Sequence, residues 1–147
     1  MDLYSEIKEQ MNLSESDPNL YSPLVLAYLG DGIFELVIRS LLVSRGNIPV
    51  EKLHKKATKY VKAEAQAAIM HGLKGSFSDK EWEIYRRGRN AKSYSSAKNA
   101  SIMDYRIATG FEALMGYLYL SKNSDRMMEI IKKGMEIIDG EQGHTGE

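Results

Sequence analysis

The segment AYLGDGIFE, residues 27–35, places an acidic residue between two glycines inside a long apolar stretch. Each glycine weakens a helix interior by about 1 kcal/mol relative to alanine. Over residues 19–38 the only charged residues are Asp31 and Glu35. Such a segment destabilises a helix that packs against a core, so Asp31 and its neighbouring glycines need an explanation other than helix stability.

The residues around this segment predict a long helix, and helical spacing of apolar residues recurs along most of the chain. Ser22 followed by Pro23 is typical of a helix start, and Gly46 is typical of a helix end, which gives a helix over residues 23–45. Further helices are expected over residues 49–60, 62–71, 78–88, 102–120 and 124–139. We therefore expect an all-α protein of about six to seven helices, with residues 88–99 as a polar loop.

The composition indicates one ordinary domain over residues 1–147, with its core in residues 19–139 and a disordered tail from residue 140. Of the 147 residues, 43% are hydrophobic and none is cysteine, which excludes disulfides and thiolate metal sites and fits a reducing compartment. No apolar run reaches the roughly 18 residues that a membrane span requires, and the first ten residues do not form a signal sequence. We expect a cytoplasmic protein with no membrane partner.

A second isolated acid, Glu112, is the only charged residue in residues 107–120. A buried carboxylate must be paired, protonated, solvated or bound to a metal. The small residues around Asp31 and Glu112 suggest space for water, a metal ion and a phosphate. The alternative is equally open: each acid could pair with a basic residue across the bundle, and Arg39 and Arg106 are candidates for Glu112. Glu35 has Arg39 at i+4, which favours a surface ion pair.

These motifs resemble those of the ribonuclease III family. LAYLGDGIFE, residues 26–35, resembles its signature helix, and TGFEALMGYLYL, residues 109–120, resembles its second catalytic helix. RRGRNAKS, residues 86–93, resembles a basic segment of the short Mini-ribonuclease III branch, which has the nuclease domain without the double-stranded-RNA-binding domain. The resemblance covers about residues 19–139, and the order and separation of the motifs agree with it.

The resemblance implies a ribonuclease III-like nuclease domain that hydrolyses phosphodiester bonds in double-stranded RNA. By the same resemblance, Asp31 and Glu112 are the catalytic residues and the ligands of Mg²⁺, for which Mn²⁺ could substitute. The longer enzymes have further acids at the positions of Leu24, Ala27 and Thr109, and this chain does not. We therefore expect weak Mg²⁺ binding without RNA.

Two stretches of the chain carry basic residues and no acid, although the net charge is zero. Residues 84–103 contain five basic residues, and residues 52–62 contain five lysines. A-form RNA is contacted mainly through its backbone and minor groove, so these stretches are candidates for binding it. A solvated helix face is the alternative for the lysines. The candidate RNA-binding residues are Arg86, Arg87, Arg89, Asn90, Lys92, Lys98, Lys55 and Lys59.

The family resemblance also implies a homodimer in which the signature helices meet and each subunit cuts one strand. Tyr28 occupies the place of an aromatic residue that inserts into the partner subunit, although an ordinary core tyrosine is an equal alternative. The implied substrate is the precursor of 23S ribosomal RNA, and a ribosomal protein is a further candidate partner. A non-catalytic RNA-binding or ribosome-associated protein on the same fold is the main alternative, followed by a helical dimerisation module.

Overall fold

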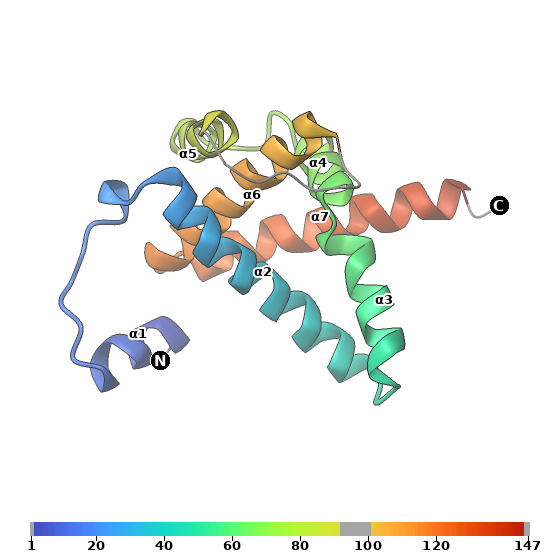
Figure 1. The fold of residues 1–147 in the computed structure, drawn as a ribbon, viewed down its shortest axis with the longest axis horizontal. Coiled ribbons are helices and arrows are strands. Elements are labelled where there is room, and N and C mark those ends of the chain that lie inside the picture. Colours follow the sequence, from blue (N-terminus) through green and yellow to red (C-terminus); the bar gives the residue numbers. More distant parts are fainter. Residues whose placement is uncertain (1, 92–100, 146–147) are drawn as a thin grey trace.

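The computed structural model describes residues 2–91 and 101–145, and only the backbone of residues 141–145. In these residues every regular element is helical, as expected (Figure 1). None of the described helices is long and apolar enough to cross a membrane. The helices are α1 (Leu3–Gln10), the short 3₁₀ helix η1 (Pro18–Leu20), α2 (Pro23–Arg45), α3 (Val50–Val61), α4 (Ala63–Gly72), α5 (Asp79–Asn90), α6 (Ile102–Leu120) and α7 (Ser124–Thr145).

The two long central helices begin and end where the sequence predicts. The Ser22 hydroxyl accepts a hydrogen bond from the Val25 amide at the start of α2, and Gly46 follows its last residue. Ser101 caps α6 in the same way. Each cap satisfies an amide that the helix itself cannot pair. These boundaries depend on local chemistry and were therefore visible in the sequence.

Two glycines let α2 and α6 cross backbone against backbone, in the most extensive helix–helix contact of the described chain. A Cβ atom at Gly30 would lie 1.7 Å from the carbonyl oxygen of Glu112, and one at Gly116 would lie 2.1 Å from that of Leu26. The idea that these two glycines leave room for a ligand is therefore wrong, because the opposite helix fills the space. Of the two glycines beside Asp31, Gly32 is the one that faces open space, with nothing within 4 Å of its Cβ position.

The core lies where α2 and α6 meet the surrounding helices. Phe34 and Phe111 are fully buried and pack edge to face, with their ring centroids 5.1 Å apart. Residues from α4 and α7, such as Ile69 and Ile131, complete the cluster. The core therefore fixes the middle of α2 against the middle of α6, which are the segments that carry Asp31 and Glu112.

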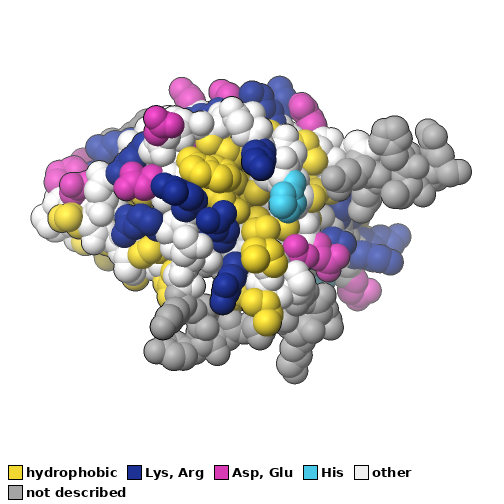
Figure 2. All heavy atoms as spheres, turned by 90° about the horizontal axis from the view of Figure 1, so that it is seen from above, with side chains coloured by type: hydrophobic (Ala, Val, Ile, Leu, Met, Phe, Trp, Pro, Cys, Tyr) yellow, Lys and Arg dark blue, Asp and Glu magenta, His cyan; other side chains and the backbone are white. Residues whose placement is uncertain are grey.

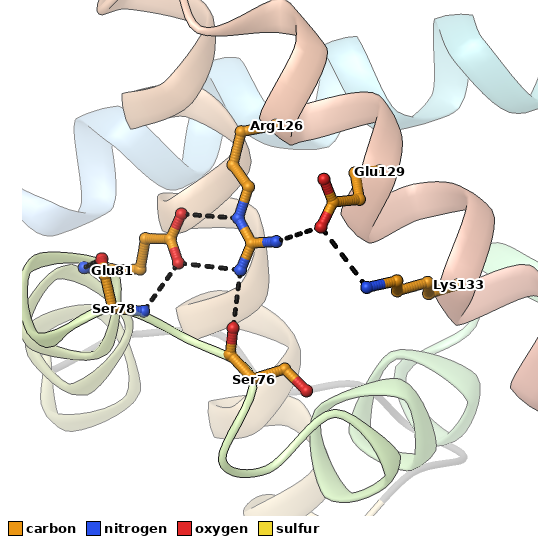
Figure 3. Close-up of polar contacts among 6 residues, drawn as sticks. All are labelled: Ser76, Ser78, Glu81, Arg126, Glu129 and Lys133. Atoms are coloured by element: carbon orange, nitrogen blue, oxygen red, sulfur yellow. Dashed lines mark hydrogen bonds and ion pairs between the residues drawn. The ribbon is translucent and has the colours of Figure 1, made fainter.

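Arg126 ties α7 to the start of α5 (Figure 3). Its guanidinium donates two hydrogen bonds to Glu81, from Nε to Oε2 at 2.8 Å and from Nη2 to Oε1 at 3.0 Å, and another to the carbonyl oxygen of Ser76. Glu81 also closes a capping box with Ser78, at the predicted start of this helix. The hydrogen bond from Arg126 is the main cause of the lowered pKa of Glu81. This bridge fixes the helix whose far end carries Arg86 and Arg87.

Three features differ from the sequence-based expectation. Helix α1 was missed, and it joins the bundle through the Tyr4 ring, whose centroid lies 5.1 Å from that of Tyr119. Helix α5 continues to Asn90 instead of ending at Gly88, because Gly88 is buried against α6 and does not stop the helix. Helix α7 continues to Thr145, beyond the predicted end at residue 139.

Candidate active site

The structure brings Asp31 on α2 and Glu112 on α6 together, although they are 81 positions apart in the sequence. The glycine crossing explains this arrangement. Gly30 contacts the backbone of Glu112, so the next residue, Asp31, is held beside that side chain. Asp31 is exposed and Glu112 is partly buried. The two carboxylates therefore form a site that is open to solvent on one side.

The pKa of Glu112 is raised to about 8. Burial is the largest cause, and the negative charge of Asp31 is the second. The more distant charge of Glu35 acts in the same direction, whereas a hydrogen bond from Gln66 lowers the pKa. Burial and a neighbouring like charge both disfavour the ionised form. The site therefore brings two acids together, and no positive charge of the described residues compensates their effect on Glu112.

The ion pairs considered for these acids are not found. Among the described residues, no lysine or arginine forms an ion pair with Asp31 or Glu112. Arg39 pairs with Glu35 instead, at 2.9 Å between Nη2 and Oε2, which confirms the surface pair expected at i+4. The pairing alternative for Glu112 is therefore wrong in the described chain.

Gln66 on α4 is a site residue that the sequence analysis missed. Its side chain is 2% exposed, and its Nε2 donates to Glu112 Oε2 at 3.2 Å and to the Val61 carbonyl oxygen at 2.9 Å. The only signal in the sequence was a single amide in the buried, alanine-rich stretch AEAQAAIM. The sequence does not show how α4 packs on α6, so it does not connect this amide with Glu112.

The carboxylate pair fits a magnesium ion, as judged from the donor set. Carboxylate oxygens suit this hard cation, which usually keeps several waters and needs only one or two protein carboxylates. A cation between Asp31 and Glu112 would also offset the repulsion that raises the pKa of Glu112. Within the described residues no cluster of three or more acidic or histidine side chains could hold a metal. The Thr109 hydroxyl donates back to Tyr105 of its own helix at 3.0 Å.

The candidate RNA-binding residues occupy several places on the surface. Lys92 and Lys98 lie outside the described residues, whereas Arg86, Arg87 and Lys55 are exposed. Arg89 lies over the Tyr85 ring, 5.5 Å from its centroid, and donates to Asn90. Lys59 is 2.8 Å from Asp139 in an ion pair. The face seen from above in Figure 1, on the α4 and α5 side, shows lysine and arginine side chains around a hydrophobic area (Figure 2).

Tyr28 is 85% exposed, so the interpretation of this residue as part of the core is wrong. Val25, Leu36 and Val43 on the same helix are exposed as well. The spacing from Val25 to Tyr28 is three residues, and the spacing from Leu36 to Val43 is seven, which places each pair on one side of a helix. Helix α2 thus presents exposed apolar side chains to the outside of this chain.

The raised pKa of Glu112 predicts that Glu112→Gln stabilises the metal-free protein at high pH. Glu112 keeps its proton up to about pH 8 when folded but loses it near pH 4.5 when unfolded, so the wild type loses stability as the pH rises between these values. Each unit of pKa difference corresponds to about 1.4 kcal/mol. At pH 9 with EDTA, we expect the variant to melt on the order of 10 °C higher.

At pH 4 the melting temperatures of the two proteins should agree, because Glu112 is then protonated in both states. Glu35→Gln is the control, since Glu35 is paired with Arg39 at the surface and should not give this gain. Equal melting temperatures of Glu112→Gln and wild type at pH 9 would contradict the burial and charge repulsion described above.

Comparison with known proteins agrees with this architecture. Residues 24–123 match the family model described as the Ribonuclease III domain. The Mini-ribonuclease 3 of Brevibacillus brevis is 50% identical over 125 residues, 85% of this chain and 93% of the relative. That of Clostridium tetani is 42% identical over 135 residues, 91% of this chain and 89% of the relative. A crystal structure of a protein from Fusobacterium nucleatum superposes with a TM-score of 0.72 and 32% identity, over 83% of this chain and 95% of that one.

Proposed function

Because the chain belongs to the ribonuclease III family and is a double-strand-specific endoribonuclease, we propose that Asp31 and Glu112 hold Mg²⁺ at the site where this enzyme cuts RNA. The observation that carries the proposal is the pair of adjacent carboxylates without a compensating cation among the described residues. When bound, the metal would supply a water of lowered pKa and stabilise charge on the phosphate. Ribonuclease III enzymes generally use a divalent ion, and Mn²⁺ is the expected substitute.

The two carboxylates have different parts in this proposal. Asp31 is exposed and can meet a cation that arrives from solvent. Glu112 is partly buried and must give up a proton before it can serve as a ligand, because its pKa is about 8 in the metal-free protein. A bound cation lowers that pKa by favouring the ionised form. Cation binding near neutral pH therefore releases a proton from Glu112.

We propose that the basic surface holds the duplex. Arg86 and Arg87 lie exposed near the end of α5, and Lys55 is exposed on α3. Arginine and lysine bind phosphates without reading base edges, which suits the backbone recognition of A-form RNA. Lys59 would have to leave Asp139 to take part. Arg89 and Asn90 lie at the end of α5, next to Lys92 in the sequence.

A second copy of the chain is the proposed partner at the exposed apolar side chains of α2. Tyr28 is the most exposed large hydrophobic residue of the described chain. Exposed aromatic and aliphatic groups of this kind are typical of protein–protein interfaces. Two copies would supply two carboxylate pairs, one for each strand of an RNA duplex.

The proposed substrate in the cell is the precursor of 23S ribosomal RNA, in the cytoplasm of a bacterium. Support comes from the resemblance to the Mini-ribonuclease III branch and from the identity of 50% with one such enzyme. The absence of cysteine fits the reducing compartment in which ribosomal RNA is processed. A ribosomal protein bound to the precursor remains a candidate partner.

A duplex RNA labelled on both strands tests the proposal. We expect both strands to be cut when Mg²⁺ or Mn²⁺ is present and neither when EDTA is present, while light scattering on the same preparation gives the mass of a dimer. Binding should weaken steeply with added salt, because each phosphate contact releases a counterion. No cleavage at any Mg²⁺ or Mn²⁺ concentration, under conditions in which the duplex is bound, would overturn the catalytic proposal.

That outcome would favour the second candidate, an RNA-binding or ribosome-associated protein without nuclease activity. The feature that favours this candidate is the absence of acids at Leu24, Ala27 and Thr109. Ala27 and Thr109 are buried, and the Thr109 hydroxyl is bonded within its own helix. These positions therefore add no carboxylate to the pair formed by Asp31 and Glu112.

A further inference from the structure

We propose that Gln66 is a positioning residue, which holds the Glu112 carboxylate in the orientation that a divalent cation requires. The inference rests on the proposed function and adds to it a residue from a third helix. Gln66 lies in the first half of α4, which packs against α6, whereas Asp31 and Glu112 lie on α2 and α6. The site is then built by three helices, although only two of them supply carboxylates.

Two hydrogen bonds fix the Gln66 amide. Nε2 donates one proton to the carbonyl oxygen of Val61, the last residue of α3, and the other to Glu112 Oε2. The Val61 carbonyl oxygen can only accept, so a flipped amide would place its own oxygen against that oxygen. The orientation of the group is thus set by chemistry, and Glu112 is tied through it to the corner between α3 and α4.

The other end of the amide shows that this arrangement has a cost. The oxygen Oε1 of Gln66 is buried and has no hydrogen-bond partner among the described residues. An unpaired buried acceptor costs about 1–3 kcal/mol. An apolar side chain of similar length would avoid this cost and still fill the space. That side chain would also leave the Val61 carbonyl oxygen and Glu112 without their donor, so the amide serves the two acceptors that it joins rather than the filling of space.

Of the groups that influence Glu112, Gln66 is the one suited to orient its carboxylate. The charged groups that influence Glu112 are Asp31 and Glu35, both on α2, and both repel it. Among the described residues, the side-chain amide that donates to Glu112 is that of Gln66, at 3.2 Å. Residues that hydrogen-bond to a metal ligand without contacting the metal orient that ligand. Their replacement typically lowers metal affinity or activity by about 10–100-fold. Without its donor, Glu112 would be free to turn away from Asp31.

The test replaces Gln66 by a side chain of similar volume that has no amide. For Gln66→Met we expect Mn²⁺ binding without RNA, followed by the electron paramagnetic resonance of free Mn²⁺, to weaken about 10–100-fold. The Mg²⁺ concentration that gives half-maximal cleavage should rise by a similar factor. The melting temperature in EDTA should change little, because the loss of the two hydrogen bonds is offset by the removal of the unpaired Oε1. Gln66→Asn, whose amide is too short to reach both partners, should weaken Mn²⁺ binding as well.

Met70→Leu is the matched control, one turn further along α4 and equally buried, and it should leave Mn²⁺ binding unchanged. Normal Mn²⁺ binding by a folded Gln66→Met would overturn the proposal. So would a failure of both Gln66 variants to fold, since Gln66 would then be required by the structure alone. If the wild type binds Mn²⁺ but does not cleave RNA, the proposed function fails while the role of Gln66 at the cation is still measured.

Discussion

Asp31→Asn and Glu112→Gln are each expected to reduce the cleavage of duplex RNA by about 10³-fold or more. Each substitution removes one of the two negative charges that hold the cation. Stabilisation of charge by a metal ion is worth several kcal/mol in a transition state, and each 1.4 kcal/mol changes a rate about tenfold. Single-turnover cleavage of a labelled duplex at saturating Mg²⁺ measures the effect. Circular dichroism shows whether the variants are folded.

Two comparisons separate this effect from a general loss of structure. Glu112→Gln is expected to make the metal-free protein more stable above pH 8, so its inactivity could not be attributed to unfolding. Glu35→Gln removes an acid one turn from Asp31 on the same helix, and we expect it to change cleavage by less than about tenfold, because Glu35 is paired with Arg39. Cleavage at the wild-type rate by either Asp31→Asn or Glu112→Gln would refute the two-carboxylate site.

The elements that the sequence predicted correctly depend on local chemistry. Ser22, Ser78 and Ser101 cap helices through bonds to amides three residues away, so these helix starts can be recognised without the fold. Asp31 and Glu112 were conspicuous because each is an isolated charge in an apolar helix. Their association could be predicted only by resemblance, since nothing in either helix specifies which face meets the other.

The features that the sequence did not reveal depend on contacts between distant elements. Gln66 reaches Glu112 across 46 positions, and Arg126 reaches Glu81 across 45. Helix α1 was missed because its acidic, polar sequence has few apolar residues, and it is held by contacts such as that between Tyr4 and Tyr119. Gly30 was interpreted as making space for a ligand, whereas it makes space for the backbone of another helix.

We therefore expect opposite changes in the free energy of unfolding when each of the two glycines beside Asp31 is replaced by alanine. For Gly30→Ala, the new methyl group would overlap the Glu112 carbonyl, and α2 and α6 would have to separate. Overpacking usually costs about 1–3 kcal/mol, and a clash with rigid backbone exceeds that range, so we expect a loss of about 4 kcal/mol or more. For Gly32→Ala, no atom lies near the new group, and we expect a gain of about 0.5–1 kcal/mol from helix propensity.

Urea unfolding of the two variants in EDTA measures these free energies, and metal binding shows their consequence for the site. Separation of α2 from α6 moves Asp31 away from Glu112, so any Gly30→Ala that remains folded should bind Mn²⁺ more weakly than the wild type. Gly32→Ala should bind it equally well, since no atom lies within 4 Å of the new methyl group. Equal stability of the two variants would contradict the backbone crossing. The crossing places Gly30 of LGDG against the backbone of α6 and Asp31 beside Glu112, so Gly30 serves the packing of the two helices and Asp31 serves the site.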